Sequence, residues 1–121
     1  GCKVRSIELN VMQRCSSHIA SLTDINEAAQ IGSAAVEAAM NGESGKMMVF
    51  HRISNNPYRV EILSSDINGI ANMEKKFPTE WISKDGNNVT TDALNYFLPL
   101  IQGEVHPEYR NGIPVHFRLD Q

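Results

Sequence analysis

The sequence predicts an α/β domain in which a mixed sheet is flanked by helices. Short runs with strand-like alternation occur near both ends and in the middle of the chain, and two stretches with helical apolar spacing separate them. The predicted order is strand, helix, hairpin, helix, helix, strand, which is typical of α/β folds. A chain of 121 residues that is 41% hydrophobic is long enough for one domain with a core.

The first predicted strand covers residues 4–12. Apolar Ile7, Leu9 and Val11 alternate there with polar residues, which is the pattern of a half-buried strand. The polar residues 13–18 follow the carboxyl end of that strand.

The clearest predicted helix covers residues 24–41. Thr23 and Asp24 are candidate N-caps, and Glu27 follows Asp24 at the spacing of a capping box. Asn41 and Gly42 supply a stop. Apolar and small residues three and four apart form a stripe that we expect to lie close to a sheet: Ile25, Ala28, Ala29, Gly32, Ala35, Val36 and Ala39.

Residues 46–53 and 58–63 read as a hairpin, because turn-forming residues 55–57 separate two β-compatible runs. Ser65 and Asp66 then cap a short helical segment that extends to about Lys76.

The last third of the chain predicts one helix and one strand. Thr90 or Thr91 caps a helix that ends at Gly103, and Pro99 inside it should kink or split it. The inward positions of this helix are Ala93, Leu94, Phe97, Leu98 and Ile101. The final strand has alternating Ile113, Val115, Phe117 and Leu119.

Composition and motifs exclude several functions. A formal net charge of -3 gives no basic footprint for nucleic acid, and no apolar stretch approaches the roughly 20 residues of a membrane span. The start has no apolar signal region, so we expect a cytoplasmic protein in which Cys2 and Cys15 are reduced thiols; a disulfide is the alternative. Glycine-rich nucleotide loops, nucleophile elbows and metal-ligand spacings are absent from the sequence.

The residues that best suit a ligand lie in the polar segment 13–18. In open α/β sheets, ligands collect beyond the carboxyl ends of strands. Arg14 offers a planar fork of donors that suits phosphate, and serine hydroxyls and His18 add donors. The alternative is that Arg14 is an exposed residue paired with a surface carboxylate and His18 a loop residue.

These residues also carry a family resemblance. The run from IELNVMQRCSSHIAS to GKMMVFHR, with NMEKKFPTEWI, GNNVT and PLIQGE further on, resembles the C-terminal region of 6-phosphofructokinases. It is most similar to the pyrophosphate-dependent (diphosphate–fructose-6-phosphate 1-phosphotransferase) branch. The resemblance implies part of the two-domain phosphofructokinase fold, with an active site that transfers a phosphoryl group to the 1-hydroxyl of fructose 6-phosphate.

The resemblance implies that Arg14 of the QR motif reaches across a subunit interface to the sugar 6-phosphate, beside Gln13. Many members carry a second phosphate-binding arginine in a longer following segment, which has no counterpart here. We expect His18 to line the same phosphate site.

The resemblance also shows what the chain lacks. The GGD-type loop for the phosphoryl donor and the PKTIDND-type segment with the catalytic aspartate do not occur in it. We therefore expect residues 1–121 to be one domain and a C-terminal fragment of a longer two-domain enzyme, inactive without its N-terminal part. Mg²⁺ and homo-oligomer formation are implied for the parent enzyme, with no cofactor on the fragment and either ATP or pyrophosphate as donor. The alternative is a stand-alone module that binds a phosphorylated metabolite or mediates oligomerisation.

Overall fold

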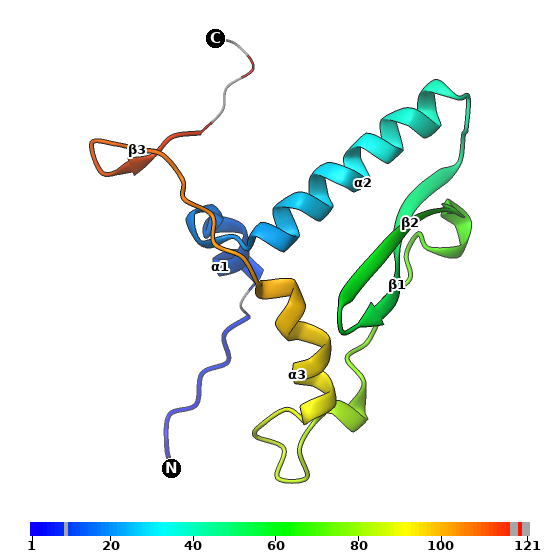
Figure 1. Cartoon of the computed structure of the whole chain (residues 1–121). Helices are drawn as coiled ribbons and strands as arrows, with labels where there is room; N and C mark the ends of the chain where they lie inside the picture. The colour runs from blue at the N-terminus through cyan, green and yellow to red at the C-terminus, as the bar shows by residue number, and fades with distance from the viewer. Residues whose placement is uncertain (9, 117–118, 120–121) are drawn as a thin grey trace.

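Helices and two small antiparallel sheets make up the described part of the protein. The computed structural model describes residues 1–8, 10–116 and 119. In Figure 1 the hairpin lies along one side of the long helix, and both ends of the chain project from this body. The elements in chain order are α1 (Asn10–Cys15), η1 (Ser17–Ile19), α2 (Leu22–Met40), β1 (Lys46–Asn55), β2 (Tyr58–Asp66), η2 (Ile67–Gly69), η3 (Thr79–Trp81), α3 (Thr91–Phe97), η4 (Leu98–Ile101), β3 (Tyr109–Arg110) and β4 (Ile113–Pro114).

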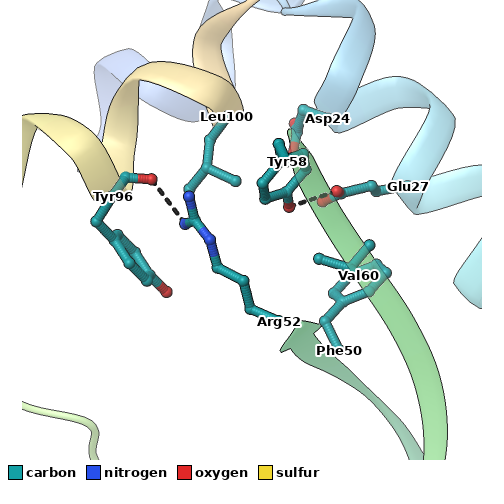
Figure 2. A pocket seen from close by; sticks show the side chains of 8 residues that line it. All are labelled: Asp24, Glu27, Phe50, Arg52, Tyr58, Val60, Tyr96 and Leu100. Carbon is teal, nitrogen blue, oxygen red and sulfur yellow. Dashed lines mark hydrogen bonds between the residues drawn. The ribbon is translucent and has the colours of Figure 1, made fainter. Parts of the chain in front are cut away.

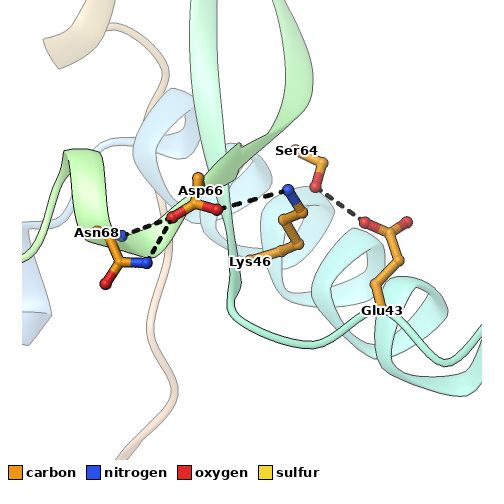
Figure 3. Close-up of polar contacts among 5 residues, drawn as sticks. All are labelled: Glu43, Lys46, Ser64, Asp66 and Asn68. Carbon is orange, nitrogen blue, oxygen red and sulfur yellow. Dashed lines mark hydrogen bonds and ion pairs between the residues drawn. The ribbon is translucent and has the colours of Figure 1, made fainter.

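The predicted hairpin is confirmed. Strands β1 and β2 pair antiparallel, with one register shift between Arg52 and Ser54. Polar contacts hold the open end of the hairpin (Figure 3): Lys46 Nζ lies 3.9 Å from Asp66 Oδ2, and the backbone N–H of Asn68 donates to Asp66 Oδ1 at 2.9 Å. The hydrogen bond from the Asn68 backbone is the main cause that lowers the pKa of Asp66, and the Lys46 charge adds to it.

A second contact at this end joins the hairpin to the turn after α2. The Ser64 hydroxyl donates to Glu43 Oε2 at 2.9 Å, as Figure 3 shows. The loop between α2 and β1 is thereby held to β2 as well as to its own strand.

Helix α2 begins earlier than the sequence predicted. Ser21 is the N-cap, and its hydroxyl accepts the backbone N–H of Asp24 at 3.2 Å. The expectation of a cap at Thr23 or Asp24 was therefore wrong, because both lie inside the first turn. The predicted end is confirmed: Asn41 is the C-cap and Gly42 follows with φ of 80°.

The N-terminus of α2 is fastened to the segment after η4. The Ser21 hydroxyl donates to the carbonyl oxygen of Leu100 at 2.7 Å, and the Thr23 hydroxyl to that of Gln102 at 3.1 Å. The backbone N–H of Leu22 donates to Gly103 at 3.0 Å. Gly103 has φ of 85°, and a Cβ built there would lie 2.6 Å from Leu22 Cβ, so only glycine fits without a shift.

Pro99 divides the next helix as expected. Helix α3 ends at Phe97 and a 3₁₀ segment, η4, contains the proline. Of the five positions expected to face inward, only Ala93 is fully buried. The expectation was wrong for Ile101, whose side chain is 70% exposed, and only partly met for the others, which remain partly exposed: Leu94, Phe97 and Leu98. Aromatic rings gather around α3 and η3: Phe77, Trp81, Tyr96 and Phe97.

Three other expectations were wrong or only partly met. Residues 1–8 form no strand and α1 starts at Asn10, because no described strand lies beside them to take their backbone hydrogen bonds; Leu9 lies outside the described residues. The helical segment after Asp66 is only the three residues of η2. At the C-terminal end β4 is two residues long, and Phe117 lies outside the described residues.

The α/β class is confirmed. The sheets are smaller than expected, since each has two strands, and every strand pair among the described residues is antiparallel. The parallel pairing of a mixed sheet is not found in this part of the chain.

Candidate functional site

The residues expected to bind phosphate lie together on one short segment before α2. Gln13 and Arg14 are in the last turn of α1, and His18 is in η1. The Ser16 hydroxyl donates to the carbonyl oxygen of Met12 at 2.7 Å and so satisfies a free carbonyl at the end of α1.

Both Arg14 and His18 are exposed. Within the described part of the chain, no hydrogen bond or ion pair engages the Arg14 guanidinium. The paired-surface-arginine alternative therefore has no support among these residues.

A separate pocket of about 260 Å³ lies where the hairpin meets α2 and the α3–η4 segment (Figure 2). We call it the junction pocket. It is lined by Asp24, Glu27, Phe50, Arg52, Tyr58, Val60, Tyr96 and Leu100.

Arg52 joins strand β1 to the end of α3. Its guanidinium carbon lies 4.7 Å from the ring centre of Tyr58 and 4.4 Å from that of Tyr96. Its Nη1 donates to the carbonyl oxygen of Tyr96 at 2.7 Å, and its Nη2 reaches that of Asn95 at 3.4 Å. A cation at the C-terminus of a helix also opposes the negative end of the helix dipole.

Tyr58 joins strand β2 to α2. Its hydroxyl donates to Glu27 Oε1 at 2.5 Å, as drawn in Figure 2. Burial is the main cause that raises the pKa of Tyr58 to about 12, and the hydrogen bond to Glu27 is the second. The hydroxyl therefore remains a donor at neutral pH.

These contacts define what the junction pocket does. The donors of Arg52 Nη1 and of Tyr58 are already engaged within the chain, and both connect elements that are distant in sequence. The pocket is a structural junction that fixes the hairpin, α2 and α3 relative to one another. It thereby also holds the start of α2, directly after the segment that carries Arg14 and His18.

Sequence reasoning missed this junction. One signal was available: Arg52 is a charged residue close to the apolar Val49, Phe50 and Ile53 in the same strand, where burial of a charge requires partners. Its partner Tyr96 is too remote in the sequence for any spacing rule to connect the two.

The described residues also bear on metal binding, membrane insertion and thiol chemistry. No group of three or more metal-ligating side chains occurs among them. None of the helices in this part of the chain is long and apolar enough to cross a membrane. Cys2 and Cys15 are free and exposed.

The chain is similar in sequence to enzymes of known name. It is 41% identical over 119 residues to the pyrophosphate–fructose 6-phosphate 1-phosphotransferase of Methylococcus capsulatus, covering 98% of the chain and 28% of that enzyme. It is 38% identical over 114 residues to the enzyme of the same name from Halomonas elongata, covering 94% of the chain and 27% of that enzyme. No family model matches the chain.

The fold is similar as well. The crystal structure of a pyrophosphate-dependent phosphofructokinase from Marinobacter aquaeolei matches with a TM-score of 0.81 and 38% identity, over 88% of this chain and 27% of that one. The chain thus spans little more than a quarter of the proteins it matches, and its place at their C-terminal end stays a prediction. The resemblance to the pyrophosphate-dependent branch is confirmed: the chain is homologous to a segment of the pyrophosphate-dependent phosphofructokinases.

Proposed function

We propose that the chain is a fragment of an enzyme that phosphorylates fructose 6-phosphate with pyrophosphate. The observation that carries this proposal is the similarity over 98% of the chain to a pyrophosphate–fructose 6-phosphate 1-phosphotransferase. The names of its relatives favour pyrophosphate over ATP, which the sequence alone left open.

The proposed reaction is a phosphoryl transfer. The 1-hydroxyl oxygen of the sugar bonds to one phosphorus of pyrophosphate, the bridging P–O bond breaks, and orthophosphate leaves. The hydroxyl proton passes to a carboxylate that we place in the part of the enzyme outside this chain. The chain carries no donor loop, so we expect it to be inactive by itself: incubating it with both substrates should give no orthophosphate, and any turnover would overturn this expectation.

Arg14 is proposed to bind the 6-phosphate, with Gln13 and His18 beside it. Supporting this, its guanidinium is exposed and unengaged within the described residues, and its planar fork suits a phosphate oxygen pair. The missing N-terminal part, a homo-oligomeric assembly, Mg²⁺ and a cytoplasmic location belong to the same proposal.

The test is Arg14→Ala in the parent enzyme. Loss of charged hydrogen bonds should raise KM for fructose 6-phosphate by roughly 10- to 100-fold, while KM for pyrophosphate stays unchanged. Arg59→Ala is the matched control, since Arg59 is an exposed arginine on β2, away from this segment. Equal KM values for the two variants would show that Arg14 has no part in substrate binding.

A further inference from the structure

We infer that Ser21 and Thr23 are positioning residues for the proposed phosphate site. Their hydroxyls hold the segment that carries Arg14 in the place where its guanidinium meets the sugar 6-phosphate. Neither residue contacts the substrate itself, and both act through Arg14. The inference rests on the proposed function, because it concerns the same site.

The two hydroxyls belong to a set of hydrogen bonds that we call the α2 clamp. The clamp joins the start of α2 to the end of η4 and the residues that follow it: Ser21, Leu22 and Thr23 on one side, and Leu100, Gln102 and Gly103 on the other. The hydroxyls donate across it at 2.7 and 3.1 Å, and backbone N–H groups donate at 3.0 and 3.2 Å. Ser21 is half-buried and is also the N-cap of α2.

The clamp is what attaches the segment before α2 to distant parts of the described chain. The other hydrogen bonds described for residues 10–20 are local: the Ser16 hydroxyl donates to Met12, and the backbone N–H of Ile19 donates to Ser16 at 3.0 Å. Apolar packing adds little to this attachment, since Met12 is 60% and Ile19 72% exposed. Within the described residues, the position of this segment therefore depends on the clamp.

Little free chain separates the clamp from Arg14. Arg14 is in the last turn of α1, Ser16 lies between α1 and η1, and Ala20 alone lies between η1 and Ser21. Short helical elements transmit a displacement because their backbones are held by internal hydrogen bonds. A shift at Ser21 therefore also moves the Arg14 guanidinium, whose planar fork must match the phosphate oxygens. A misplacement of about 1 Å can cost about 100-fold in activity.

The experiment measures KM for both substrates in the full parent enzyme. Ser21→Ala removes the bond to Leu100, and Thr23→Val removes the bond to Gln102 without changing the N-cap. We expect KM for fructose 6-phosphate to rise about fivefold to tenfold in Ser21→Ala and about twofold to fivefold in Thr23→Val, with KM for pyrophosphate unchanged in both.

Two further variants separate positioning from a general loss of stability. Ser64→Ala removes a serine hydroxyl bond to Glu43 at the opposite end of α2, and it should leave both KM values unchanged. Ser21→Thr keeps a hydroxyl that can cap the helix and donate to Leu100, so its KM should stay within about twofold of the unsubstituted enzyme. Equal rises in KM for fructose 6-phosphate and for pyrophosphate in Ser21→Ala would overturn the inference.

A double variant shows whether Ser21 acts through Arg14. Ser21→Ala should raise KM for fructose 6-phosphate by less than about twofold when Arg14→Ala is already present, because the group that it displaces is absent. A rise as large as that caused by Ser21→Ala alone would mean that the two residues act independently, which overturns the inference.

Failure of this inference is distinguishable from failure of the proposed function. A raised KM for fructose 6-phosphate in Arg14→Ala, with no change in Ser21→Ala and Thr23→Val, overturns the inference and leaves the proposed role of Arg14 standing. An unchanged KM in Arg14→Ala refutes that role, and the inference with it. If the Ser21→Ala enzyme does not fold, Thr23→Val decides alone.

Discussion

Replacing Gly103 by alanine should destabilise the chain by about 3 kcal/mol. The glycine has φ of 85°, and forcing an L-residue into this region costs roughly 1–2 kcal/mol. The new Cβ would lie 2.6 Å from Leu22 Cβ, and relieving such overpacking costs about 1–3 kcal/mol. Alanine also lowers the conformational entropy of the unfolded chain, which offsets the loss in the free energy of unfolding by about 0.4–1 kcal/mol.

The matched control is Gly112→Ala. Gly112 has φ of 80° but nothing within 4 Å of a built Cβ, so it carries the backbone strain without the collision. Its expected cost is about 1 kcal/mol, by the same backbone and unfolded-state terms. Urea unfolding followed by circular dichroism gives both values, and equal costs would refute the reasoning. Adding Leu22→Ala should not rescue Gly103→Ala, because alanine keeps the Cβ that collides.

The junction pocket gives two further predictions. Arg52→Met should lower the free energy of unfolding by about 3 kcal/mol, because it removes a charged hydrogen bond and two cation–π contacts. Arg52→Lys keeps the charge and should lower the free energy of unfolding by about half as much. Equal urea midpoints for Arg52→Met and the unsubstituted chain would contradict this prediction. For Tyr58, a folded-state pKa of about 12 against an ordinary 10.0 means that its contribution to stability is present below pH 10 and is lost as the pH rises towards 12. Unfolding midpoints measured across that range should fall for the unsubstituted chain and fall less for Tyr58→Phe; parallel curves would contradict the assignment.

Local signals account for what the sequence predicted well. The turn at residues 55–57, the stop at Asn41 and Gly42, and the break at Pro99 all act over a few residues, and each is found in the structure. The segment with Arg14 and His18 was chosen for its chemistry and for its position after a strand predicted at residues 4–12. That strand is not formed by residues 1–8, and the role of the segment stays a prediction.

Features that depend on distant partners could not be predicted in this way. Alternation at residues 4–12 indicates a strand only if another strand lies beside it, and none does among the described residues. The N-cap of α2 is Ser21 and not the predicted Thr23 or Asp24. The Ser21 hydroxyl accepts the backbone N–H of Asp24 and also donates to the carbonyl oxygen of Leu100, 79 residues further along the chain. Arg52 is explained by Tyr58 and Tyr96, which only the fold brings together.

The long-range bonds at the start of α2 also impose an order on folding during synthesis. Ser21 and Thr23 leave the ribosome long before Leu100 and Gln102. The carbonyl oxygens of Leu100 and Gln102 accept the hydrogen bonds that the hydroxyls of Ser21 and Thr23 donate. A nascent chain that stops short of residue 100 can form the hairpin, whose strands are adjacent in sequence, but it leaves the first turn of α2 without these bonds. The segment with Arg14, immediately before that turn, acquires its final support only when the last fifth of the chain has been made.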